Sequence, residues 1–272
     1  MTRPARPGLS FGIGAVVGTA GGLIGLGGAE FRLPALVGVL RFSMREAIVV
    51  NLVASFVVLT AALPFRTATV PVAEILPHMP AVLAMLAGSM SAAWLGAGWL
   101  HRVPDRALGR LILILLVVLG LVLIAEGLFA TQPQRLAGEG LAATLLAAAA
   151  CGVVIGLVSS LLGVAGGELI IPAFILLFGV DVKLAGSLAI LVGLPTIAVG
   201  LSRHFGAGAV LRQKAQWRGT ILPLAAGSIC GAILGALALG AVPSQALKIG
   251  LGLILIWSAW GVFRHLPAPA RR

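Results

Sequence analysis

Residues 25–34 read Gly25-Leu26-Gly27-Gly28-Ala29-Glu30-Phe31-Arg32-Leu33-Pro34, and the pattern returns 138 residues later as Gly163-Val164-Ala165-Gly166-Gly167-Glu168-Leu169-Ile170-Ile171-Pro172. Each copy places glycines, a glutamate and a proline, in that order, inside a long apolar run. Glycine and proline interrupt helices. A carboxylate inside such a run is costly and marks a functional site by default. The two stretches therefore predict the site, and the rest of the chain is expected to form the frame around them.

The composition is that of a protein dissolved in lipid. Of the 272 residues, 60% are hydrophobic and only 10% are charged, and the mean hydropathy is +1.12. A soluble domain carries about 25% charged residues, so this chain cannot cover a water-facing surface. We predict an all-α, polytopic membrane protein, with no polar stretch long enough for a separate soluble domain.

The charge and the reactive side chains exclude several functions. The net charge of +11 comes from cations scattered at the ends of apolar segments, as the positive-inside rule expects, and does not predict nucleic-acid binding. Cys151 and Cys230 lie among small apolar residues and are interpreted as packing residues. The four histidines share no metal-ligand spacing and no serine sits in a nucleophile motif. The glycines lack the dinucleotide-binding spacing, so no metal, cofactor or enzyme activity is predicted.

Eight apolar elements follow one another along the chain. Residues 9–40, which contain the first motif, would measure about 48 Å as one straight helix, against a membrane core of about 30 Å. This element must therefore tilt steeply, or break at the glycines into a hairpin that enters and returns. Residues 66–78 read as a proline-rich loop, and 203–218 as a basic loop. The remaining elements are predicted at 44–65, 79–100, 108–130, 141–178, 184–202, 219–240 and 245–263.

The motif copies belong to a longer internal duplication. We predict a first transmembrane repeat at residues 1–130, a linker at 131–140 and a second repeat at 141–272. Duplicated sets of hydrophobic elements are typical of secondary transporters. The supporting matches are Gly14 and Gly18 with Gly152 and Gly156, at an offset of 138, and Ala87-Gly88-Ser89 with Ala226-Gly227-Ser228, at an offset of 139.

The cations favour inverted repeats, each beginning with a glycine-broken hairpin. If the motif elements are hairpins, all but four of the Lys and Arg residues outside the motifs fall on one side of the membrane. Equivalent loops also differ in charge, because the one at Val103-Pro104 is basic and the one at Val242-Pro243 is nearly neutral. This is expected when the two halves point in opposite directions. The four exceptions are Arg66, Arg135, Lys183 and Lys248.

A helix broken at glycine exposes backbone N–H groups where its second half begins, which makes an anion site. In inverted repeats two such ends meet near the middle of the membrane. Arg32 either binds the anion or extends to the interface and pairs there. Asn51 and Ser187 either contribute to the site or only pack helices. The predicted anion-binding residues are Gly27, Gly28, Ala29, Arg32, Asn51, Gly166, Gly167 and Ser187.

The two glutamates predict coupling to protons. Glu30 and Glu168 lie just beyond the glycines, so an anion in the site is repelled by either carboxylate when it is ionised and tolerated when it is protonated. The alternative for Glu30 is a structural role as a partner of Arg32 or a cap of freed N–H groups. In the second copy Ile170 stands at the position of the arginine, so the glutamate there lacks that neighbour.

The paired Gly-x-Gly-Gly…Pro motif, one per half, resembles the sulfite exporter TauE/SafE family of transporters, from about Gly12 to Arg264. The family pattern is close to Gly-x-Gly-Gly-Gly-x-x-x-x-Pro. In this chain Ala29 and Ala165 each replace a glycine, and Glu30 and Glu168 replace an apolar residue. The resemblance implies passage of a sulfur-containing anion, such as sulfite, thiosulfate or an organosulfonate, across the bacterial inner membrane.

The function expected from these observations is proton-coupled anion transport. The expected partners are the small anion, protons and the lipid bilayer, both termini are expected in the cytoplasm, and a homodimer is left open. The competing hypotheses are an anion channel, a transporter of another small carboxylate or oxyanion, and a membrane enzyme or scaffold. A channel would need a continuous polar pore, whereas the few polar residues here favour an occluded site.

Overall fold

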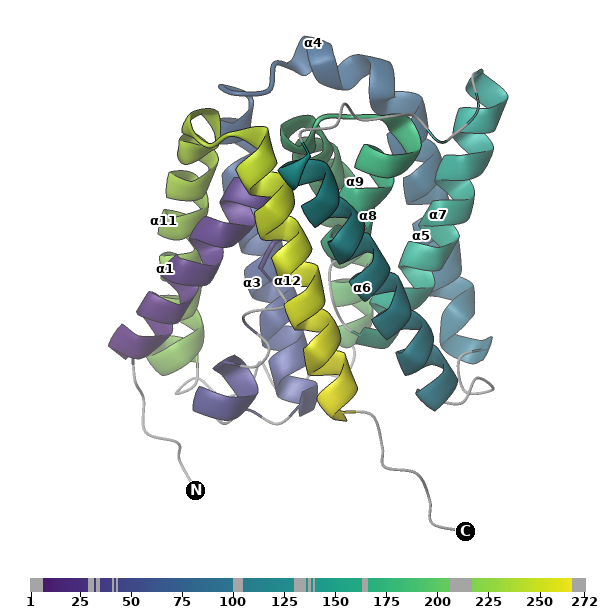
Figure 1. Cartoon of the computed structure of the whole chain (residues 1–272). Coiled ribbons are helices and arrows are strands. Elements are labelled where there is room, and N and C mark those ends of the chain that lie inside the picture. Colours follow the sequence, from purple (N-terminus) through teal and green to yellow (C-terminus); the bar gives the residue numbers. More distant parts are fainter. Residues whose placement is uncertain are drawn as a thin grey trace.

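A computed structural model describes residues 7–28, 32, 35–40, 42, 44–99, 105–129, 136, 138, 140–162, 166–205 and 217–265. Within these ranges the chain is mostly helical, with no strand, and the helices form one bundle (Figure 1). Five helices in the described part are long and apolar enough to cross a membrane. The prediction of an all-α, multi-pass membrane protein is confirmed.

The first half contains α1 (Pro7–Ile24), the π-helical turn η1 (Ala35–Val39), α3 (Met44–Arg66), the short α4 (Val72–Ile75) and η2 (Leu76–His78), α5 (Met79–Trp99) and α6 (Asp105–Leu128). The second half contains α7 (Leu141–Leu162), α8 (Gly167–Phe178), α9 (Val182–Phe205), the π-helical turn η5 (Trp217–Ile221), α11 (Leu222–Ala238), the short η6 (Leu239–Ala241) and α12 (Ser244–His265). Six of the eight predicted apolar elements coincide with α3, α5, α6, α9, α11 and α12 to within a few residues, whereas the elements predicted at 9–40 and 141–178 each contain more than one helix.

The prediction of a loop over residues 66–78 was wrong for Arg66 and for Val72–His78, and within this segment residues 67–71 alone are non-helical. Helix α3 includes Arg66, and α4 with η2 occupies Val72–His78. Pro71 is the N-cap of α4 and a second proline, Pro77, lies in the first turn of η2. Proline lacks a backbone N–H group, but the N–H groups at the start of a helix have no partner within the helix. Proline is therefore tolerated in the first turn, and these two prolines stand where helices begin. At the other predicted loop α9 continues to Phe205, and residues 206–216 lie outside the described part.

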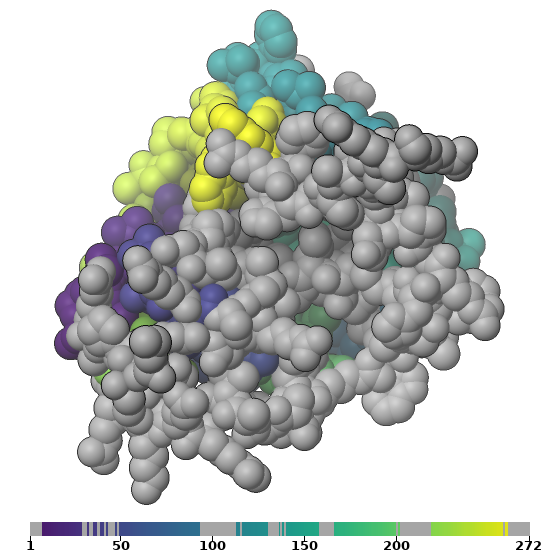
Figure 2. Space-filling model, turned by 90° about the horizontal axis from the view of Figure 1, so that it is seen from below, coloured from purple at the N-terminus to yellow at the C-terminus, as the bar shows by residue number. Residues whose placement is uncertain are grey.

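Two pairs of helices pack closely and run parallel, and each pair contains one helix from each half of the chain. α1 lies along α11, and α5 lies along α7; Figure 2 shows the purple atoms of α1 beside the yellow-green atoms of α11. Glycines allow this approach, since a Cβ on Gly14 would lie 2.2 Å from the backbone oxygen of Leu224. The same contacts occur in both pairs. Between α1 and α11, Gly14 contacts Leu224 and Gly18 contacts Ser228; at the equivalent positions of the sequence repeat, Gly152 of α7 contacts Met85 of α5 and Gly156 contacts Ser89.

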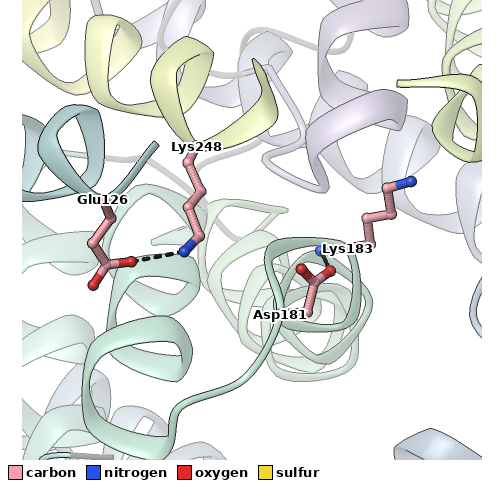
Figure 3. Close-up of polar contacts among 4 residues, drawn as sticks. All are labelled: Glu126, Asp181, Lys183 and Lys248. Atoms are coloured by element: carbon pink, nitrogen blue, oxygen red, sulfur yellow. Dashed lines mark hydrogen bonds and ion pairs between the residues drawn. The ribbon is translucent and has the colours of Figure 1, made fainter. Parts of the chain in front are cut away.

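The final helices of the two halves, α6 and α12, pack antiparallel. Gly120 faces Gly252, whereas Gly127, further along α6, faces Gln245, which is earlier in α12. One ion pair joins them inside this apolar interface: Lys248 Nζ lies 2.9 Å from Glu126 Oε2, and both side chains are largely buried (Figure 3).

Helix α8 lies inside the bundle, where it packs against α9 and contacts α6 and α7. Its side chains are among the most buried in the chain, with Ile171, Phe174 and Ile175 all at 0% exposure. A helix that is apolar on every side is expected to be enclosed. The protein therefore holds the beginning of α8, from Gly167 on, away from its surface.

Candidate functional site

The first motif breaks the chain after α1. The helix ends at Ile24, and three of the next four residues have positive φ: Gly25 at 94°, Gly27 at 79° and Gly28 at 72°. Only glycine adopts this conformation without a steric cost. Of the two arrangements that the sequence left open for this element, the structure contains a break and not one long tilted helix.

The second motif forms a hairpin. Gly166 has φ 73° and caps α8, which is 12 residues long, or about 18 Å at 1.5 Å per residue. The N–H of Leu136, just before α7, donates to the oxygen of Leu176 near the end of α8, at 3.3 Å. The end of α8 is therefore beside the beginning of α7, so α8 returns toward the side from which α7 came.

The two breaks touch each other inside the bundle. A Cβ placed on Gly167, at the start of α8, would lie 3.2 Å from both Cα and O of Leu26 in the first break. A Cβ on Gly25 would lie 2.5 Å from the backbone oxygen of Gly186 in α9. The absence of side chains at these glycines is what lets the backbones of the two motifs meet.

Arg32 places a guanidinium directly beside the first break, with no exposure to solvent. Its Nη2 donates to the oxygen of Gly27 at 3.0 Å, and its Nη1 donates to Asn51 O at 3.3 Å, Asn51 Oδ1 at 3.4 Å and Ser55 Oγ at 3.2 Å. A Cβ on Gly28 would be 3.5 Å from Nη2. The structure thus brings together four of the predicted site residues, and Ser55 of α3 joins them.

Glu168 lies in the first turn of α8, only 4% exposed. The N–H groups of Leu169 and Ile170 both donate to Gly166 O, which makes Gly166 the acceptor of the first hydrogen bonds of α8. The positive end of the helix dipole is at this point. Ala29 and Glu30, which the sequence assigned to the same site, lie outside the described residues.

Ser187 is placed with a different cation. Its Oγ accepts a hydrogen bond from Arg66 Nε at 3.1 Å and donates to Lys183 O at 3.3 Å. Arg66, at the end of α3, is 1% exposed. Its Nη1 also donates to Gly22 O at 2.7 Å and Leu23 O at 2.9 Å, and its Nη2 donates to Lys183 O at 2.9 Å.

The reasoning from sequence missed Arg66, because a cation after an apolar run is ordinarily a loop residue. A signal for it was nevertheless present. A helix that ends inside a membrane leaves carbonyl groups that must find donors within the protein. The break after α1 therefore required a buried donor, and Arg66 supplies it to the oxygens of Gly22 and Leu23.

The two breaks present opposite backbone groups. The first leaves carbonyls, to which two guanidinium groups donate, and the second is the N-terminal end of α8, with Glu168 in its first turn. Guanidinium groups and helix N-termini both bind oxyanions well. Among the residues that the structure describes, His, Cys, Asp and Glu side chains form no group of three that could hold a metal ion.

These features define a multi-pass helical membrane protein with a buried cationic site between two helix breaks. The model of the sulfite exporter TauE/SafE family matches residues 1–123 and 148–272, and the chain belongs to this family of membrane transporters, which is not a family of enzymes. The unmatched residues between these segments include the predicted linker. No curated protein and no solved structure matches the chain.

Proposed function

We propose that the protein is a secondary transporter that carries a sulfur-containing anion, such as sulfite, thiosulfate or an organosulfonate, across the bacterial inner membrane. The observation that supports this most is the enclosed guanidinium of Arg32, placed where the backbones of the two breaks touch. Family membership supports a sulfur oxyanion as the substrate class. The proposed contact residues are Gly27, Gly28, Ala29, Arg32, Asn51, Gly166 and Gly167, with Ser187 contributing through Arg66.

The chemistry of the site suits an oxyanion. The acceptors of Arg32 given above are neutral oxygens of Gly27, Asn51 and Ser55. Hydrogen bonds to an ionised acceptor are roughly twice as strong as neutral ones. An oxyanion bound by the guanidinium of Arg32 would make charge-assisted hydrogen bonds of this kind, and the N-terminal end of α8 would favour its negative charge.

Proton coupling would come from Glu168, with Glu30 as its counterpart in the first copy. A carboxylate beside the bound anion raises its energy by charge repulsion, and protonation removes that repulsion. The burial of Glu168 at the first turn of α8 supports this role. Anion and proton would then enter and leave the site together.

Inverted repeats would give the site access to both sides. We propose that residues 1–130 and 141–272 are the two repeats and that residues 131–140 link them. Two observations support this: the equivalent glycine contacts in the pairs α1 with α11 and α5 with α7, and the antiparallel packing of α6 and α12. Equivalent helices that run in opposite directions are expected only when the repeats are inverted.

Labelling of single cysteines tests this topology. With the basic end of the bundle and both termini in the cytoplasm, a membrane-impermeant thiol reagent added outside should modify Ser244→Cys and not Asp105→Cys. Modification of Asp105→Cys alone, or of both equally, would contradict the inverted arrangement. Since Cys151 and Cys230 are free in the native chain, both are first replaced by alanine.

The function itself is tested by flux in proteoliposomes. Sulfite, thiosulfate and an organosulfonate are offered to the wild-type protein, to Arg32→Gln and to Lys183→Gln, a control that removes a cation whose side chain makes only one long hydrogen bond. We expect saturable, pH-driven flux in the wild type and control. Arg32→Gln should bind at least about 100-fold more weakly, or about 2.8 kcal/mol. Equal flux through Arg32→Gln would contradict the site. Non-saturating flux would indicate a channel, and no flux of any of the three anions would indicate another substrate.

A further inference from the structure

We propose that Arg66 is a positioning residue of the anion site: it fixes the end of α1, and with it the first glycine break, against α9. This inference deepens the proposed function and rests on it for the identity of the ligand. Arg66 would not touch the anion itself. It would act through the backbone that presents Gly27 to Arg32.

The hydrogen bonds of Arg66 join the two halves of the chain at one point. A guanidinium has five N–H donors, and the four bonds to Gly22 O, Leu23 O, Lys183 O and Ser187 Oγ occupy four of them. The first two acceptors belong to α1 and the others to the first turns of α9. Both carbonyls of α1 lie at the negative end of that helix, where a cation is favoured.

A continuous path of contacts leads from Arg66 to the site. Leu23 is two residues before Gly25, whose backbone packs against Gly186, and a Cβ on Gly186 would also lie 2.5 Å from Arg66 Nη2. Gly27, two residues further, is held by Arg32. A functional group must be held to within about 0.5 Å by its supporting residues, so a shift of the α1 end would misplace the carbonyl that orients Arg32.

Two roles of Arg66 can be told apart: it either fixes the position of the first break or only attracts the anion by its positive charge. A lysine at position 66 would keep the positive charge, but its compact ammonium cannot reproduce a planar fork that serves four oxygens on two helices. If Arg66 only attracted anions through its field, lysine would replace it fully. If it fixes the break, lysine would fail nearly as badly as glutamine.

The test compares Arg66→Lys, Arg66→Gln and Ser187→Ala, which removes one of the four acceptors. The matched control is Lys248→Gln, since it removes another buried contact between the halves, the pair with Glu126, that involves neither α1 nor α9. Two measurements are made on each purified, folded variant: the Kd for sulfite, and the hydrogen exchange of the amides of residues 22–28. The second needs no ligand.

We expect both Arg66 variants to raise the Kd for sulfite tenfold or more and to speed exchange at residues 22–28. Ser187→Ala should raise the Kd about two- to fivefold, by loss of one hydrogen bond, and Lys248→Gln should change neither measurement. Full affinity in Arg66→Lys would overturn the proposal in favour of a charge effect. If hydrogen exchange at residues 22–28 were unchanged in both Arg66 variants, the proposal would be overturned regardless of the Kd for sulfite.

A stability effect alone would also overturn the proposal. In that case the Arg66 variants would melt earlier, yet their folded fraction would bind sulfite with the wild-type Kd. If the wild type bound no sulfur oxyanion while exchange still rose in the Arg66 variants, the proposed function would fail and the positioning of the break by Arg66 would stand. If Arg66→Gln does not fold, Arg66→Lys and Ser187→Ala still decide between these outcomes.

Discussion

The two glycine breaks are copies in sequence and opposites in electrostatics. The first ends a helix, α1, so that it leaves carbonyl groups in the interior, and two buried guanidinium groups meet them. The second begins a helix, α8, so that it presents the positive end of the helix dipole, and a buried glutamate lies in its first turn. Because the breaks touch at Leu26 and Gly167, one duplicated backbone feature yields both a cationic and an acidic contribution at the same place.

A single position accounts for much of this difference. Arg32 of the first copy corresponds to Ile170 of the second, at the offset of 138. Arg32 lies in a cluster of polar groups from α3, whereas Ile170 is 1% exposed within the apolar core around α8. In the proposed function, the first copy would attract the anion and the second would respond to protons.

The largest effect is expected from filling the first break. Gly28→Leu should abolish transport, because its Cβ would lie 2.5 Å from Val17 Cγ1 and 2.8 Å from Val17 O, at φ 72°. Gly12→Leu is the control, since nothing lies within 4 Å of a Cβ at Gly12. Flux per folded protein is the measurement. Wild-type flux through Gly28→Leu would show that this glycine serves only to pack helices.

An intermediate effect is expected from separating the two breaks. Gly167→Ala places a methyl group 3.2 Å from the backbone of Leu26, which is tighter than ordinary packing, so the two motifs must move apart by a few tenths of an ångström. We expect the KM for the anion to rise about tenfold while the protein stays folded, and KM and turnover measured together in proteoliposomes check this. An unchanged KM would mean that the breaks need not touch for the anion to bind.

Hydropathy and breaker residues predicted most of the fold. The long helices lie where the apolar runs do, since a helix satisfies its backbone groups within one segment in lipid, and the first glycine cluster ends α1 where a positive φ is needed. The segment at Val72–His78 was not predicted, because its prolines suggested a loop and their position in the first turn is visible only in the structure.

The candidate site was predicted only in part. The adjacency of Gly27, Gly28 and Arg32 follows from their closeness in sequence, but the contact of Arg32 with Asn51 spans 19 residues and depends on how α3 packs. Ser187 was predicted for the same anion site as Arg32, and the structure places it in contact with Arg66. Sequence patterns indicate which residues are unusual in an apolar run, whereas the partner of a polar group depends on the packing of helices that are distant in sequence.

The smallest change in affinity is expected at the acidic break, and it tests the division of tasks most directly. Glu168→Gln mimics the protonated acid, so the anion should bind with a Kd within about threefold of the wild-type value or tighter, because charge repulsion is absent. Flux should no longer respond to an imposed pH gradient. The measurement is sulfite binding beside pH-driven flux in the same preparation.

Glu30→Gln is the matched variant, because it makes the same change in the copy that contains Arg32. Positions two apart on a regular helix do not face each other, so a link between Glu30 and Arg32 needs the broken backbone that glycine provides. Loss of that carboxylate should leave the guanidinium freer to bind the anion and alter mainly the affinity, with the response to pH retained. If Glu168→Gln keeps full pH-driven flux and Glu30→Gln loses it, the two copies have the reverse roles. If both keep it, the glutamates serve the structure, and coupling to protons must be sought elsewhere in the chain.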